Sequence, residues 1–296
     1  HPGLTCWFGE LLTETYNNDK TEPIDINRYK YVYSKALNVL PNNNILNIIN
    51  KAQQEPYKNL ILDLFRTDEK QQFKFDDKNI NYLYLNGVVD IEEFTTANNE
   101  SANYIRFASP FIQKRLFNYF AREIFTYMGK LISPFENLKN AITETNLNIK
   151  NIMKRYQKYF IKNREWLLKD APRRTDMRIY EAVYHFNLYR YLANFLESKG
   201  ANVYAEFPTG NGQIDIIIKY KNKTYGIELK SFTDTSDYKE ALIQAARYGK
   251  NLGLKKISLV FFLEEIDEEN KKKYEQDYYD KVAKITVEPI FISTMA

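Results

Sequence analysis

Apolar and polar residues recur with a helical period through the first part of the chain. Between Gly3 and about Arg66 the apolar residues are spaced three and four positions apart, and the polar stretches NNDK and PNNN interrupt them. Such spacing puts apolar side chains on one face of a helix, and the Asn- and Pro-containing breaks are typical of turns. The pattern predicts a bundle of short helices.

The pattern changes between Asp77 and Phe125. A helix-like INYLYLNG run ends at Gly87, two strand-like runs (VVDIEEF and NYIRF) flank a polar loop, and a strong helical pattern opens at Pro110. Helix, strand, loop, strand and helix in this order are typical of a winged helix. We therefore expect residues 1–132 to form a helical bundle with a winged-helix-like unit.

A basic helical connector is expected over residues 133–175. Apolar and basic residues interleave there at helical spacing, and residues 146–200 hold twelve Lys and Arg against five Asp and Glu. A basic segment of this kind can follow a phosphate backbone, with Lys158, Arg173 and Arg174 as the candidate nucleic-acid contacts. The alternative is an ordinary solvated helix face.

Residues 176–296 show a different order of elements. A long helix is predicted over about 177–198, followed by the strands NVYAEF, IDIIIKY and TYGIELK, a helix over about 238–252, and the strands KISLVFFL and ITVEPIFIS. This last run is expected to be an edge strand, because Pro289 fits an edge or a bulge better than a central position. This order predicts an α/β (α+β) fold with a mixed sheet, preceded by the all-helical and winged-helix-like region.

Composition narrows the class of protein. The chain has 296 residues, 44% hydrophobic and 27% charged, which is enough for more than one buried core. The longest strongly apolar run, residues 257–263, is far short of the roughly 20 residues that span a bilayer. A single cysteine, Cys6, and two histidines exclude a disulfide framework and a Cys/His zinc site. We expect a soluble protein of a reducing compartment, the cytoplasm, with no membrane partner.

Three charged residues stand out within the strand pair IDIIIKYKNKTYGIELK. Asp215 opens the first strand, and Glu228 and Lys230 lie at the end of the second. A short turn between antiparallel strands brings these ends together, and the two-residue period of a strand puts Glu228 and Lys230 on one face. Two carboxylates and an ammonium group at one rim suit a metal ion and phosphodiester hydrolysis. The alternative is that they are three ordinary surface charges.

These residues carry a resemblance to a known family. Asp215, twelve intervening residues and then Glu228-Leu229-Lys230, set between two αβ units, resemble the PD-(D/E)XK nuclease superfamily. Ile214 replaces the proline of the superfamily's name. The resemblance implies a restriction-endonuclease-like core over residues 176–296 and a hydrolase that cuts DNA.

Within that superfamily the chain is similar to nucleases fused to the C-terminal side of AAA-type ATPases. The similarity rests on YEAVYH ahead of the strands, on the GQID turn, on Gln244 with Tyr248 behind them, and on the winged-helix-like front part. It implies an ATPase core as a partner in a longer protein. No G-x-x-x-x-G-K-[ST] loop occurs in the sequence, so this chain alone is not expected to hydrolyse ATP.

The resemblance also implies a set of catalytic residues and a cofactor. The implied catalytic residues are Glu181, Asp215, Glu228, Lys230, Gln244 and Tyr248. Of these, Asp215, Glu228 and Glu181 are the expected ligands of Mg²⁺, with Mn²⁺ as the alternative ion. Lys230 is expected to position or deprotonate the attacking water, and Gln244 and Tyr248 to orient the phosphate or Lys230. His185, one turn after Glu181, is interpreted as a helix residue outside the chemistry.

Two classes of function follow. The first is a metal-dependent DNA endonuclease module. The second is a catalytically silent module that uses the nuclease-like fold to bind nucleic acid or to regulate an ATPase. The complete set of two acids and one lysine favours the enzyme.

Overall fold

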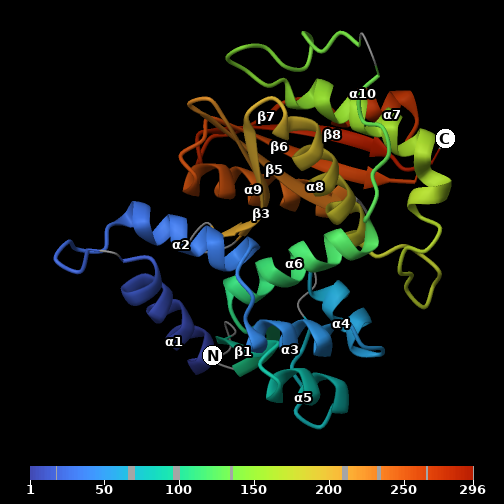
Figure 1. Ribbon diagram of the computed structural model, residues 1–296. Helices are drawn as coiled ribbons and strands as arrows, with labels where there is room; N and C mark the ends of the chain where they lie inside the picture. The colour runs from blue at the N-terminus through green and yellow to red at the C-terminus, as the bar shows by residue number, and fades with distance from the viewer. Residues whose placement is uncertain are drawn as a thin grey trace. The chain divides into compact units, whose positions relative to one another are not determined.

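The computed structural model describes residues 1–17, 19–65, 71–95, 101–133, 136–208, 213–231, 235–264 and 266–295 (Figure 1). The chain divides into two compact units, His1–Tyr119 and Phe120–Ala296. It is a mixed α/β protein in which N-terminal helices precede a six-stranded mixed sheet with interleaved helices. The predicted boundaries at 132/133 and 175/176 stay predictions.

The first unit is mainly helical, as the periodicity predicts. Its elements are α1 (Pro2–Glu10), a π-helical turn (Leu11–Thr15), α2 (Ile26–Asn38), α3 (Asn43–Ala52), α4 (Tyr57–Leu64), α5 (Lys78–Leu85), β1 (Val89–Thr95), β2 (Ser101–Phe107) and α6 (Pro110–Ile124), which contains the division between the units. Asp25, Asn42 and Asp77 cap α2, α3 and α5 by accepting backbone N–H groups of the first turn. Gly87 follows α5 with a φ of 68°, which an ordinary side chain would disfavour.

Strands β1 and β2 pair antiparallel and form a two-stranded sheet. The predicted order of helix, strand, loop, strand and helix is therefore present, with the loop over residues 96–100 outside the described residues. The winged-helix assignment itself stays a prediction.

The second unit contains the large sheet. Its elements are α7 (Ile149–Leu167), α8 (Glu181–Glu197), β3 (Ala201–Pro208), β4 (Gln213–Tyr220), β5 (Lys223–Ser231), α9 (Thr235–Asn251), β6 (Lys256–Leu263), α10 (Glu268–Tyr274), β7 (Tyr278–Asp280) and β8 (Ile285–Ser293). The strand order is β3-β4-β5-β6-β8-β7. Strands β3, β4 and β5 pair antiparallel, β5 with β6 and β6 with β8 pair parallel, and β7 adds antiparallel to β8.

Helices cover both faces of this sheet. On one face, Ala245 and Ala246 of α9 lie in a buried cluster with Phe261 of β6. The next residue on β6, Phe262, points to the opposite face and packs against the rings of Tyr156 on α7 and Tyr184 on α8. The sheet is therefore the middle layer between α9 and the α7–α8 pair.

Two helices are shorter than the sequence pattern predicts. α7 begins at Ile149, where Asn148 caps it by accepting the N–H of Asn151, so residues 136–148 precede the helix. α8 begins at Glu181 rather than near residue 177. Met177 has a φ of 68°, which no α-helix tolerates.

The prediction that β8 is an edge strand is wrong, because β8 lies between β6 and β7. The local environment of Pro289 explains the difference. The N–H of Phe291 points away from β6 and donates to Oε1 of Glu275 at 2.9 Å, so the nitrogen of Pro289, two residues earlier, points the same way. β7 pairs only with residues 285–287 of β8. The proline therefore removes no hydrogen bond from either ladder.

Among the helices formed by the described residues, none combines the length and the hydrophobicity needed to cross a membrane.

Candidate active site

Strands β4 and β5 bring Asp215, Glu228 and Lys230 to one end of the sheet. Their antiparallel register ends with Ile216 opposite Ile227, and continuing it by one step puts Asp215 opposite Glu228, in keeping with the hydrogen bond from the N–H of Leu229 to Oδ2 of Asp215. Side chains that oppose each other in this way share a face, and Lys230, two residues after Glu228, shares it too. This is the face that α9 covers, because Leu259, the partner of Glu228 on β6, belongs to the buried cluster of α9.

These three side chains form a buried polar group. Asp215, Glu228 and Lys230 are only 2%, 0% and 4% exposed. Nζ of Lys230 lies 3.8 Å from Oε1 of Glu228, and Oδ2 of Asp215 accepts the backbone N–H of Leu229 at 2.7 Å. Burying three ionisable groups costs free energy, and functional sites are where proteins most often retain such groups.

Gln244 and Tyr248 of α9 lie at the same site. They are one helical turn apart, and Nε2 of Gln244 donates to the hydroxyl oxygen of Tyr248 at 2.9 Å. Burial raises the pKa of Tyr248, and the carboxylates of Glu228 and Asp215 add to this rise, while Gln244 and the Lys230 ammonium oppose it. The hydroxyl therefore stays protonated at neutral pH and lies within electrostatic range of all three charged groups.

α8 approaches Asp215 from the other face of the sheet. Nε2 of the buried His185 lies 3.4 Å from the backbone oxygen of Asp215. Burial lowers the pKa of His185 to about 3, so the imidazole is neutral at physiological pH. Glu181 is the first residue of α8, one turn before His185, and it is half-buried. Glu181 therefore lies one helical turn from the residue that contacts Asp215.

The donor set of this site suits Mg²⁺ through two carboxylates. Within the described ranges, no group of three or more His, Cys, Asp or Glu side chains is arranged to hold a metal ion. The role of Glu181 as a third ligand stays a prediction. Protein sites commonly hold Mg²⁺ with one or two carboxylates and complete its shell with water and phosphate oxygens. Asp215 and Glu228 fit that requirement.

The three candidate nucleic-acid contacts lie on two different elements. Lys158 is exposed on α7 and lies within electrostatic range of Glu136. Arg173 and Arg174 lie in the short segment between α7 and α8, where Nη1 of Arg173 donates to the backbone oxygen of Met177 at 3.2 Å. Two different parts of the second unit, α7 and the segment that follows it, therefore supply these candidates.

Sequence reasoning did not identify the contact between His185 and Asp215. The two residues are 30 positions apart, and the contact depends on how α8 packs against β4. The available signal was the position of His185 on the same helical stripe as Glu181, one turn away.

Comparisons of the chain with protein-family models, with curated proteins and with solved structures found no match.

Proposed function

We propose that the second unit is a metal-dependent DNA endonuclease module of the PD-(D/E)XK type. The observation that carries the proposal is the meeting of Asp215, Glu228 and Lys230 in one buried group, with the Tyr248 hydroxyl in electrostatic range. The order α8-β3-β4-β5-α9-β6, with α8 and α9 on opposite faces, supports a restriction-endonuclease-like core. DNA is the proposed substrate, and an ATPase core in a longer protein is the proposed partner of the winged-helix-like first unit.

Asp215 and Glu228 would hold Mg²⁺ or Mn²⁺ in this proposal. A bound divalent ion neutralises phosphate oxygens and makes a water molecule more acidic. The fold holds the side chains of Asp215 and Glu228 in place before any ion binds. Asp215 is held by the N–H of Leu229, and Glu228 is fully buried on the neighbouring strand. With both acids ionised, the group of Asp215, Glu228 and Lys230 carries a formal charge of −1, which favours binding a cation.

Lys230 and Tyr248 act on the reacting groups. Hydrolysis joins a water oxygen to phosphorus and breaks one P–O ester bond, leaving a phosphomonoester and a hydroxyl group. Lys230, as an ammonium, would position the attacking water beside Glu228 and stabilise the hydroxide that forms when a neighbouring carboxylate takes the proton of that water. The protonated Tyr248 hydroxyl, which already accepts a hydrogen bond from Gln244, still has its own proton to donate to a phosphate oxygen.

Cleavage of supercoiled plasmid DNA tests this proposal. The wild-type chain is expected to nick or linearise the plasmid with Mg²⁺ or Mn²⁺, and EDTA should stop the reaction. Asp215→Ala removes a direct ligand and should abolish cleavage while DNA affinity is kept, or raised by weaker repulsion of phosphate. Cleavage that survives in Asp215→Ala would show that the site has been assigned to the wrong residues.

A specific observation favours the second candidate, a silent nucleic-acid-binding or regulatory module. Asp215, Glu228 and Lys230 are almost completely buried, and Lys230 already lies beside Glu228 as an internal ion pair. Such a group can serve fold specificity alone. In that case Asp215→Ala should lower the free energy of unfolding, and neither Mg²⁺ nor Mn²⁺ should stabilise the wild-type chain.

A further inference from the structure

A cavity lies at the end of the central strands opposite to Asp215, Glu228 and Lys230. It has a volume of about 1040 Å³, and its walls are formed by the segment before α7, the β4–β5 turn, the residues after α9 and the start of β6. Lys223 lines it at the first position of β5. Glu228 lies five residues further along the same strand, roughly 16 Å away at about 3.3 Å per residue. The cavity is therefore separate from the carboxylate site, the buried group of Asp215, Glu228 and Lys230.

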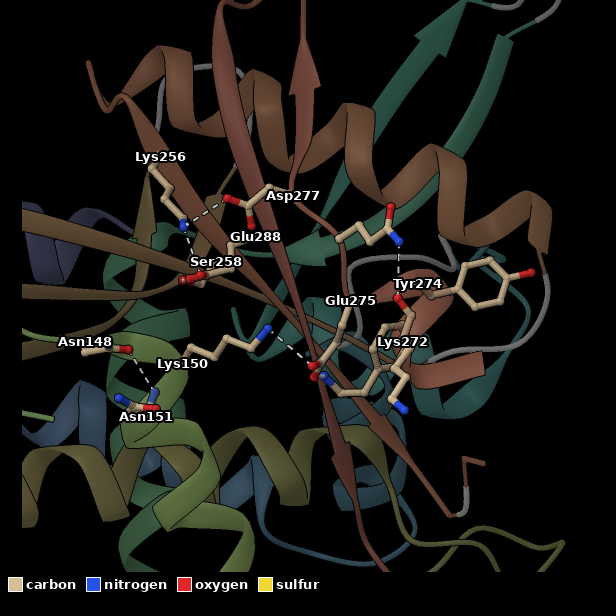
Figure 2. A network of polar contacts seen from close by, with 12 residues as sticks. Asn148, Lys150, Asn151, Lys256, Ser258, Lys272, Tyr274, Glu275, Asp277 and Glu288 are labelled. Carbon is tan, nitrogen blue, oxygen red and sulfur yellow. Dashed lines mark hydrogen bonds and ion pairs between the residues drawn. The ribbon is translucent and has the colours of Figure 1, made fainter. Parts of the chain in front are cut away.

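The lining of this cavity is positively charged. Its charged residues are Lys223, Lys255, Lys256 and Glu288, a formal excess of two positive charges. The charge of Lys256 is balanced by two carboxylates, because its Nζ lies 2.8 Å from Oε1 of Glu288 in the lining and 3.3 Å from Oδ2 of Asp277 outside it (Figure 2). The excess charge therefore belongs to Lys223 and Lys255, which are both exposed. Two ammonium groups at an open cavity favour an anionic ligand.

The same lining offers hydrogen-bonding and apolar groups. Its amide side chains are Asn140, Asn146, Asn148 and Asn222. The Oδ1 of Asn148 caps α7, and the amide of Asn146 donates to Thr145 and accepts from Lys223. The amides of Asn140 and Asn222 can both donate and accept, as the edge of a nucleobase requires. Ser258 donates to Glu288 at 3.4 Å in the wall (Figure 2), and Leu252 and Leu254 supply apolar surface against which a planar ring can pack.

We propose that this cavity is a binding site for a nucleotide. Its phosphates would lie at Lys223 and Lys255, and its base would lie between the leucines and the asparagine amides. Small-molecule sites usually measure about 300–1,000 Å³, so the cavity has room for a ligand of this class. The proposal does not depend on nuclease activity, because none of the residues that line the cavity belongs to the carboxylate site.

Isothermal titration of the full chain with ADP in EDTA tests the site. EDTA removes divalent ions, so the carboxylate site cannot contribute through a bound metal. ADP is expected to bind at one site, more tightly than pyrophosphate or adenosine. Pyrophosphate lacks the base, and adenosine lacks the phosphates. The double variant Lys223→Glu, Lys255→Glu should weaken ADP binding by about tenfold or more, since a tenfold change corresponds to about 1.4 kcal/mol.

A matched control distinguishes the effect of the two lining lysines from the effect of the overall charge of the protein. Lys272→Glu with Lys273→Glu makes the same change of charge on α10, on exposed residues outside the lining. These variants should bind ADP like the wild type. Absence of ADP binding by the wild type, an equal loss in the control variant, or equal affinity for pyrophosphate and ADP would each overturn the proposal.

Discussion

Lys230 and Gln244 are expected to contribute unequally to the proposed reaction. Lys230 lies beside Glu228 within the buried group. Gln244 instead donates a hydrogen bond to Tyr248, which lies in electrostatic range of that group. Lys230→Ala should lower the cleavage rate by on the order of 10² or more while metal binding persists, because a positioned acid–base or electrostatic group is lost. Gln244→Ala should cost roughly tenfold or less, the scale of one hydrogen bond.

Single-turnover cleavage rates under saturating DNA measure this difference, and circular dichroism checks the fold of both variants. Equal losses in Lys230→Ala and Gln244→Ala would contradict the assigned roles. Wild-type cleavage by Lys230→Ala would do the same.

His185 should make the stability of the fold depend on pH. Its pKa is lowered from 6.5 to about 3 by burial, against the hydrogen bond with Asp215. Between these values the unfolded chain binds a proton at His185 and the folded chain does not, so stability is lost as pH falls below about 6.5. The free energy of unfolding then falls by up to about 1.4 kcal/mol per pH unit. Between pH 7 and pH 5 the total fall from His185 is about 2 kcal/mol.

Urea unfolding at pH 7 and pH 5 tests this expectation. His185→Gln cannot take up the proton, so its free energy of unfolding should fall by about 2 kcal/mol less than that of the wild type. The same drop in both proteins would show that His185 is already protonated in the fold or is not buried.

The basic segment between residues 146 and 200 is divided between two elements. Lys158 lies on α7, and Arg173 and Arg174 lie in the turn that precedes α8. If these side chains neutralise DNA phosphates, reversing all three to Glu should weaken binding and reduce the slope of log K against log salt by roughly 2 to 3, since each phosphate contributes about 0.7–0.9.

Fluorescence anisotropy with labelled DNA across a range of salt concentrations measures that slope. The matched control reverses Lys271, Lys272 and Lys273, which form a basic run on α10. An unchanged slope, or the same change in the control, would identify the basic segment as an ordinary solvated surface.

Regular periodicity made most elements of the second unit predictable. The strand pair β4–β5, the apolar run of β6 and the helix α9 all follow from alternation, apolar runs and turn residues in the sequence. The charged stretch before β8 gave no such signal. It contains α10, a seven-residue helix with no fully buried residue, and β7, a three-residue strand, and both are too short to show a clear period.

The meeting of Asp215, Glu228 and Lys230 was predictable for a simple reason. A hairpin with a short turn fixes which residues oppose each other, and the two-residue period fixes their face. The contact between His185 and Asp215 was not predictable in this way, because it depends on the packing of α8 against the sheet. The interior position of β8 was also not predictable. A proline in a strand indicates an edge, and only the structure shows that the nitrogen of Pro289 points away from β6 and costs no hydrogen bond there.

The second unit as a whole presents two chemically different ends of one sheet. One end gathers buried carboxylates, and the other is a positively charged cavity. The proposed nuclease therefore depends on whether the carboxylate end accepts a divalent cation. That question concerns binding and can be answered without any knowledge of the DNA substrate.

Mn²⁺ soaked into crystals of the full chain answers it most directly, because anomalous scattering locates the ion. The proposed function predicts an anomalous peak bonded to carboxylate oxygens of both Asp215 and Glu228, and no such peak in crystals of Asp215→Ala. A wild-type map without Mn²⁺ beside these two carboxylates, at a concentration that saturates ordinary Mg²⁺ enzymes, would contradict the account.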